Sequence, residues 1–175
     1  GTEQNGDHIV LGKHNVRARI LAGEIADRLG NALVAPVIAY VPEGSIDPPT
    51  GHMRQAGTIT VPVDAFERSL ESAIRSFLKH GFSAVVLLGD HGGYQASLHR
   101  VAGRLNRGRS RPVVVVPKEY YRDMEHAGVD DTALTLAIDP GLVREARGAK
   151  VEAGRVARRE IVERTVRAVQ SALPR

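Results

Sequence analysis

The stretch "FSAVVLLGDHGGYQASLHRVAGRLN" (residues 82–106) decides the fold. Residues 82–89 are apolar on both faces, which is typical of a parallel strand buried between layers of helices. A glycine-rich turn follows, and the apolar side chains of 94–106 then recur at helical spacing. Strand, turn and helix in this order are the repeating unit of an α/β fold. Ligands collect at the carboxyl ends of such strands, so Asp90 and His91 in the turn are candidates for a site.

The same alternation extends to both sides of this stretch. Apolar periodicity predicts helices at 15–30, from Asp64 to Gly81, at 130–143 with a stop at Pro140, and at 155–173. Short apolar runs predict buried strands at 31–41 and 111–117, with an extended piece at 57–63. We therefore expect one domain over residues 1–175, a three-layer α/β/α sandwich with a mainly parallel central sheet.

Composition excludes several classes of function. The 175 residues include no cysteine, so any metal must be bound by His, Asp and Glu. The net charge is +4, but aromatic residues are only 4% and many arginines alternate with glutamates, so we expect no nucleic-acid partner. No apolar window reaches membrane length and no signal peptide is visible, so we expect no membrane partner. The compartment stays open between the cytoplasm and export with the N-terminus removed.

Three segments concentrate potential metal ligands, each with glycines close by. They are "GTEQNGDHIVLGKHN" (1–15), "GDHGG" (89–93) and "EHAGVDDT" (125–132). Imidazole and carboxylate together suit Zn²⁺, Mn²⁺ or Fe²⁺. Each segment also has a plainer interpretation, since Asp90 could only form a turn and Asp130 could only cap a helix. The Walker lysine, the G-x-G-x-x-G pattern and the G-x-S-x-G elbow are all missing, which disfavours a nucleotide-binding module and a serine hydrolase.

In order along the chain, "GTEQNGDHIVLGKHN", "AGTITV" (56–61), "LGDHGGY" (88–94) and "HAGVDDTAL" (126–134) resemble the four motifs of the creatininase (creatinine amidohydrolase) family. The resemblance covers nearly all of the chain, and the order of four motifs is more specific than any one of them. It implies that a strand which should precede Gly1 is missing from this sequence.

The resemblance implies a set of site residues. The implied metal ligands are Glu3, His14, His91 and Asp131, and His126 would be the catalytic residue beside the substrate. Further residues would line the site, namely Asn5, His8 and Asp90, which would support the ligands from behind or replace them, and Gly92, Gly93 and Tyr94 as substrate-binding residues.

Departures from the family pattern change the expected metal count. Asn5 stands in place of a histidine ligand, and His14 stands in place of an aspartate that can bridge two metals. An imidazole normally gives one nitrogen to one metal. The resemblance therefore implies one or two divalent ions, Zn²⁺ or Mn²⁺ with Fe²⁺ as a third candidate, and we expect one.

The implied function is metal-dependent hydrolysis of a C–N bond in a small cyclic or linear amide. The alternative, motivated by Asn5 and His14, is a metal-binding family member with altered or lost catalysis and a role in binding or assembly. The expected partner is a small-molecule amide. A homo-oligomer is expected by analogy with the family.

Overall fold

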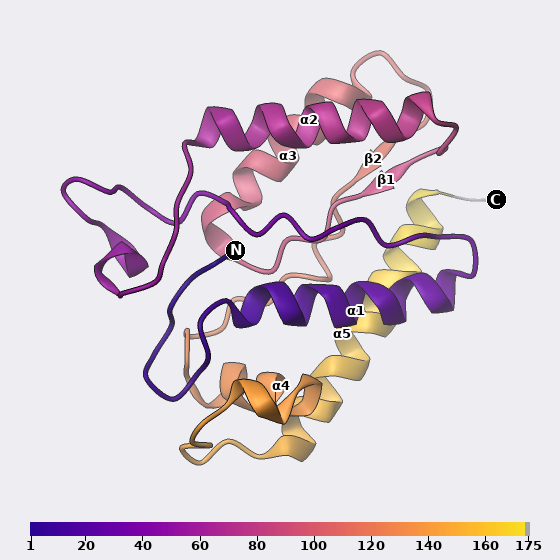
Figure 1. Cartoon of the computed structure of the whole chain (residues 1–175). Helices are drawn as coiled ribbons and strands as arrows, with labels where there is room; N and C mark the ends of the chain where they lie inside the picture. The colour runs from indigo at the N-terminus through magenta and orange to yellow at the C-terminus, as the bar shows by residue number, and fades with distance from the viewer. Residues whose placement is uncertain (174–175) are drawn as a thin grey trace.

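The computed structural model describes residues 1–173 and has an α/β fold (Figure 1). In chain order the elements are α1 (Lys13–Leu29), η1 (Gly51–Arg54), α2 (Val63–Lys79), β1 (Val85–Val86), η2 (Gly92–Tyr94), α3 (Gln95–Asn106), β2 (Val114–Val115), α4 (Val129–Ile138), η3 (Pro140–Leu142) and α5 (Val151–Ala172). Each helix predicted from apolar periodicity is present. The helix predicted at 130–143 ends before Pro140, and only a short 3₁₀ turn continues it.

β1 and β2 pair in parallel, with Val85 opposite Val114 and Val86 opposite Val115. Both lie inside the stretches predicted as strands, but the paired portions are only two residues long.

The prediction of a buried strand at 31–41 is wrong. The segment is not paired as a strand until Val41, which forms an isolated parallel bridge with Thr60. Most of its side chains are exposed, with Leu33 at 80% and Tyr40 at 57%. Apolar sequence expresses a preference for burial, whereas actual burial requires neighbouring strands and helices on both sides. In the described part of the chain, neighbouring strands and helices do not cover the 31–41 segment on both sides.

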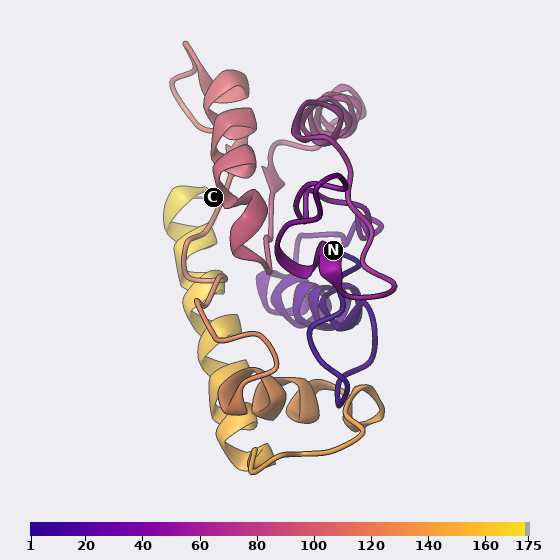
Figure 2. The same ribbon diagram turned by 90° about the vertical axis from the view of Figure 1, so that its left-hand side faces the viewer.

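Helices pack on both sides of the strands to complete the three layers (Figure 1). One core cluster joins α2, α3 and β2, with Phe66, Leu98 and Val114 among its buried members. A second cluster joins α1, α4 and α5 around Tyr120 and Leu134. α4 lies across one end of α5, which the rotated view shows clearly (Figure 2).

Two glycines allow this packing. Gly12 has φ 73°, a left-handed conformation from which α1 starts. A Cβ added at Gly154 of α5 would lie 1.8 Å from the carbonyl oxygen of Ala133 in α4, so only glycine permits this close approach. No helix in residues 1–173 is both long enough and apolar enough to cross a membrane.

Candidate metal centre

Glu3 lies at the centre of a group of four histidines. Its Oε2 is 3.6 Å from Nε2 of His14 and 3.9 Å from Nε2 of His126. Its Oε1 is 3.5 Å from Nε2 of His91 and 3.9 Å from Nε2 of His52. The structure thus brings together residues that are more than a hundred positions apart in the sequence.

Several elements hold this group in place. Glu3 lies in the segment before α1, His14 lies in the first turn of α1, and His91 lies in the turn that follows β1. His52 lies in η1, and His126 lies just before α4. The turn after β1 is where an α/β sheet presents its ligands.

The Glu3 carboxylate is almost completely buried, at 1% exposure. Nδ2 of Asn5 donates a hydrogen bond of 2.7 Å to its Oε2. Burial opposes ionisation of Glu3, but the His14 ring, His91 and the Asn5 amide outweigh that effect and lower the pKa of Glu3 to about 2. Glu3 is therefore an anion at neutral pH.

Asp90 orients the His14 ring. Oδ2 of Asp90 lies 2.9 Å from Nδ1 of His14, and Nε2 of His14 is buried with no hydrogen-bond partner in the described residues. A carboxylate on one ring nitrogen fixes the tautomer and leaves the other nitrogen as a lone-pair donor, which is the arrangement found behind metal-bound histidines. The free nitrogen faces Glu3.

Behind these residues lies a buried network of charges. Arg17 donates to both oxygens of Asp90, at 2.8 and 3.0 Å, and to Oδ1 of Asp131 at 2.6 Å. Lys13 pairs with Oδ2 of Asp131, which also accepts the N–H of Ala127. α1 thereby connects the turn after β1 with the loop before α4.

Asp131 was expected as a metal ligand, but the structure engages both its oxygens with Lys13, Arg17 and the Ala127 N–H. The nearby Lys13 and Arg17 charges overcome burial and lower its pKa to about 2. It belongs to neither group of described residues whose donor atoms are spaced for a metal. Its geometry fits a residue that orders the 126–131 loop.

The remaining predicted residues lie around this centre rather than in it. Nε2 of His8 is 3.3 Å from Oγ1 of Thr132. The hydroxyl of Tyr94 accepts the Asp90 N–H, and its ring is buried beside Phe66, so its side chain belongs to the core.

Gly92 and Gly93 lie in the turn after β1 at positions where a side chain would meet close neighbours. A Cβ on Gly92 would lie 2.8 Å from the Tyr121 hydroxyl, and one on Gly93 would lie 3.1 Å from the His91 ring. The N–H of Gly93 donates to Nδ1 of His91 at 3.3 Å.

Two residues of the centre, Glu43 and His52, were not predicted. Both lie in the 42–57 loop, which reads as an ordinary loop rich in Pro and Gly. For His52 a signal was present, because it lies just upstream of the "AGTITV" motif. Glu43 has no such signal. Burial and the neighbouring Glu3 carboxylate raise the pKa of Glu43 to about 8.

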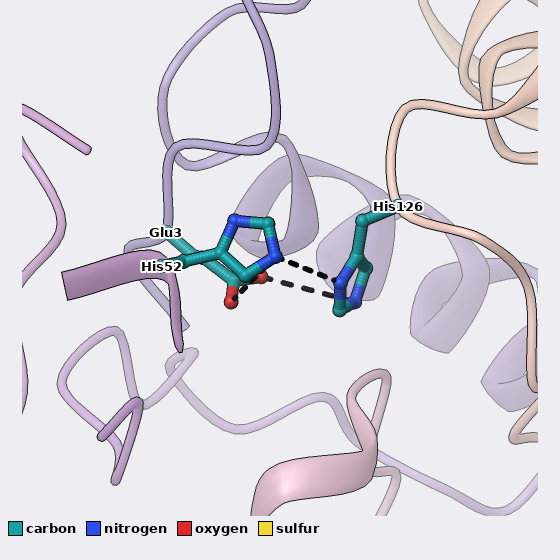
Figure 3. Close-up of side chains that lie close together, drawn as sticks. All are labelled: Glu3, His52 and His126. Atoms are coloured by element: carbon teal, nitrogen blue, oxygen red, sulfur yellow. Dashed lines mark hydrogen bonds and ion pairs between the residues drawn. The ribbon is translucent and has the colours of Figure 1, made fainter. Parts of the chain in front are cut away.

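Donor atoms in this centre are spaced for a metal. Among residues 1–173, two sets have donor atoms that all lie within 4.8 Å of one another: Glu3 with His52 and His126, and Glu3 with Glu43 and His91. Figure 3 shows the first set, with both imidazoles turned toward the Glu3 carboxylate. Carboxylate and imidazole are the donors that Zn²⁺ and Mn²⁺ accept, and the unpartnered Nε2 of His14 faces the same point. The residues therefore fit a divalent metal.

The centre has a buried side and a solvent-facing side. The side chains of Glu3 and His14 are 1% and 2% exposed, whereas those of His52 and His126 are 28% and 31% exposed. Nδ1 of His126 is 3.1 Å from Nε2 of His52. Burial, followed by nearby histidines and Lys13, lowers the pKa of His126 despite the opposing charge of Glu3. His126 is thus neutral at neutral pH and lies on the solvent-facing side.

Comparison with solved structures supports the fold assignment. A mutant creatininase complexed with creatine matches with a TM-score of 0.79 and 20% identity, over 100% of this chain and 89% of that chain. A mutant creatininase of the Zn-Zn type matches with a TM-score of 0.78 and 21% identity, over 99% and 88%. A Mn creatininase matches with a TM-score of 0.75 and 21% identity, over 100% and 89%. At these identities the likeness establishes the fold.

Comparison with family models goes further than the fold. A search among curated proteins finds no match. The model of the creatininase family, described as creatinine amidohydrolase, matches residues 1–172. With a match over almost the whole sequence, the chain belongs to the creatininase family.

Proposed function

We propose that this chain is a metal-dependent amidohydrolase that hydrolyses a C–N bond of a small cyclic or linear amide. The observation that carries the proposal is the Glu3 carboxylate, which is buried, ionised and surrounded by the Nε2 atoms of four histidines. Family membership and the metals named for the solved creatininases support the same interpretation.

In this proposal Glu3, His14 and His91 hold the ion from the buried side. When bound, a divalent ion activates a water molecule and polarises a substrate carbonyl. Asp90 keeps Nε2 of His14 free to bind the ion. Asp131 takes the role of ordering the loop that carries His126, because its oxygens are already engaged.

His126 is the residue that we propose moves the proton. Its Nδ1 lies against Nε2 of His52, while Nδ1 of His52 lies 2.8 Å from the carbonyl oxygen of Gln4. If His52 donates to Gln4, its Nε2 accepts from Nδ1 of His126, and Nε2 of His126 is left as a base. It would take a proton and return it to the leaving nitrogen. The two rings are 28% and 31% exposed, which supports a step on the side of the centre that faces solvent.

The test combines metal analysis with a substrate screen. The purified protein is analysed for bound metal and then assayed, with Zn²⁺ or Mn²⁺, against small lactams and linear amides including creatinine. Bound metal with turnover is the expected result. Bound metal with no turnover of any amide would contradict the hydrolase, and failure to bind either metal would contradict the metal centre as well.

Matched variants sharpen the result. We expect His91→Ala to lose metal and activity together, whereas His99→Ala, which changes an exposed histidine of α3, should lose neither. A homo-oligomer, proposed by analogy with the family, is tested by light scattering on the same sample.

A further inference from the structure

Glu43 is the most unusual buried group in the molecule. It lies outside all four motifs, and its side chain is 0% exposed. Neither of its carboxylate oxygens has a hydrogen-bond partner in the described residues. Oε2 lies 3.1 Å from Nδ1 of His91 without forming a hydrogen bond with it. A buried carboxylate without a partner is strongly unfavourable, so this position calls for a cation.

The charged side chains around the site also leave Glu43 without a cation. Of the two buried cations, Lys13 pairs with Asp131, and Arg17 pairs with both Asp90 and Asp131. Among the described side chains no lysine or arginine pairs with Glu3 or Glu43. Two carboxylates are therefore left without a charged side-chain partner, and one divalent cation would neutralise both.

We propose that Glu43 is a metal ligand and that Glu3, Glu43 and His91 together form the position at which the divalent ion binds most tightly. Donor atoms of these three residues lie within 4.8 Å of one another, and all three residues are buried. The 42–57 loop thus completes the centre with a carboxylate that the motifs do not supply. This inference rests on the proposed function, because it needs a metal at Glu3.

Glu43→Gln is the direct test, because glutamine has nearly the size and polarity of a protonated glutamic acid. If Glu43 were only a protonated neighbour, the variant would bind metal as the wild type does. If Glu43 is a ligand, the change replaces a carboxylate donor with a weaker amide oxygen and removes half of the neutralising charge. The control is Asp47→Asn, which removes an exposed carboxylate from the same loop.

Each protein is stripped of metal with a chelator and titrated with Zn²⁺ against a chromophoric competitor. We expect Glu43→Gln to bind Zn²⁺ more than about 100-fold more weakly, beyond the roughly 10- to 100-fold loss that removing a residue which only orients a metal-bound histidine causes, and Asp47→Asn to be unchanged. A loss of about 100-fold or less in Glu43→Gln would overturn the inference while leaving the proposed function intact. No Zn²⁺ binding by the wild type would instead overturn the proposed function.

Thermal melting keeps the test valid if folding is affected. Metal-free Glu43→Gln should melt at or above the wild-type temperature, because an unpartnered buried carboxylate has been removed, and Zn²⁺ should raise its melting temperature less. Should it fail to fold, Glu43→Asp keeps the charge but draws the carboxylate back by one methylene, and weaker Zn²⁺ binding is expected. An unchanged Zn²⁺ affinity in that variant would overturn the inference.

Discussion

Arg17 is the residue on which the buried network depends, and Arg17→Met tests that role. The guanidinium is 2% exposed and donates three hydrogen bonds to carboxylates, two to Asp90 and one to Asp131, and its Nη2 also lies 3.3 Å from Nδ1 of His14. Methionine fills similar space without charge, so the substitution removes the cation and leaves the carboxylates behind. Asp131 keeps Lys13 as a partner, whereas the Asp90 carboxylate keeps only His14.

The cost of this change follows from those partners. Removing one member of a buried ion pair costs about 3–5 kcal/mol. Because Lys13 still neutralises Asp131, we expect the lower end, about 3 kcal/mol of the free energy of unfolding. Urea denaturation of the metal-free protein at pH 7 measures it. Arg68→Met, which breaks an exposed pair with Asp64, should cost less than about 1 kcal/mol.

A loss of less than about 1 kcal/mol in Arg17→Met would refute the reasoning. It would mean that Asp90 and Asp131 reach water or other partners when the arginine is gone. A double-mutant cycle with Asp90→Asn separates these cases, because coupling is expected only if the two groups depend on each other.

Three further changes give independent checks. Asp131→Asn should be less stable than the wild type at pH 6, and the difference of about 2 kcal/mol should shrink steadily as the pH is lowered from about 5 through 2, because the folded pKa of about 2 lies below the unfolded value; a difference as large at pH 2 as at pH 6 would contradict it. His126→Gln should lower kcat by about 10²- to 10⁴-fold while metal content stays at the wild-type level, and loss of metal would instead make it a ligand. Gly154→Ala should lower the free energy of unfolding by about 1–3 kcal/mol, because its Cβ meets the α4 backbone. Gly23→Ala in α1, where nothing lies within 4 Å, should raise it by up to about 1 kcal/mol, and equal effects at the two glycines would refute the close approach.

Local pattern predicted the helices well, because each one carries its own apolar face. Gly30 ends α1 in a left-handed conformation, as its position after the periodic run predicts. The 31–41 segment failed for the opposite reason. Its apolar residues carry no information about whether neighbouring elements are present to cover them, and most of its side chains are exposed.

The site residues also divide into those that a local pattern predicts and those that it does not. Glu3, His14, His91 and His126 lie in recognisable motifs, and the structure brings them together. Glu43 and His52 come from a loop whose path depends on tertiary contacts, such as the hydrogen bond from Glu43 N–H to Oγ1 of Thr60. No local pattern encodes that path. Asp131 shows a different limit. A motif identifies the residue type at this position, but it does not predict which side chains will pair with that residue.

Metal placement tests the central claim most directly. Crystals soaked in Zn²⁺ and measured at the zinc absorption edge will show an anomalous peak at each bound ion. We predict a peak about 2 Å from a carboxylate oxygen of Glu3 and from a ring nitrogen of His91. The absence of a peak beside Glu3, with zinc bound elsewhere or not at all, would contradict the account.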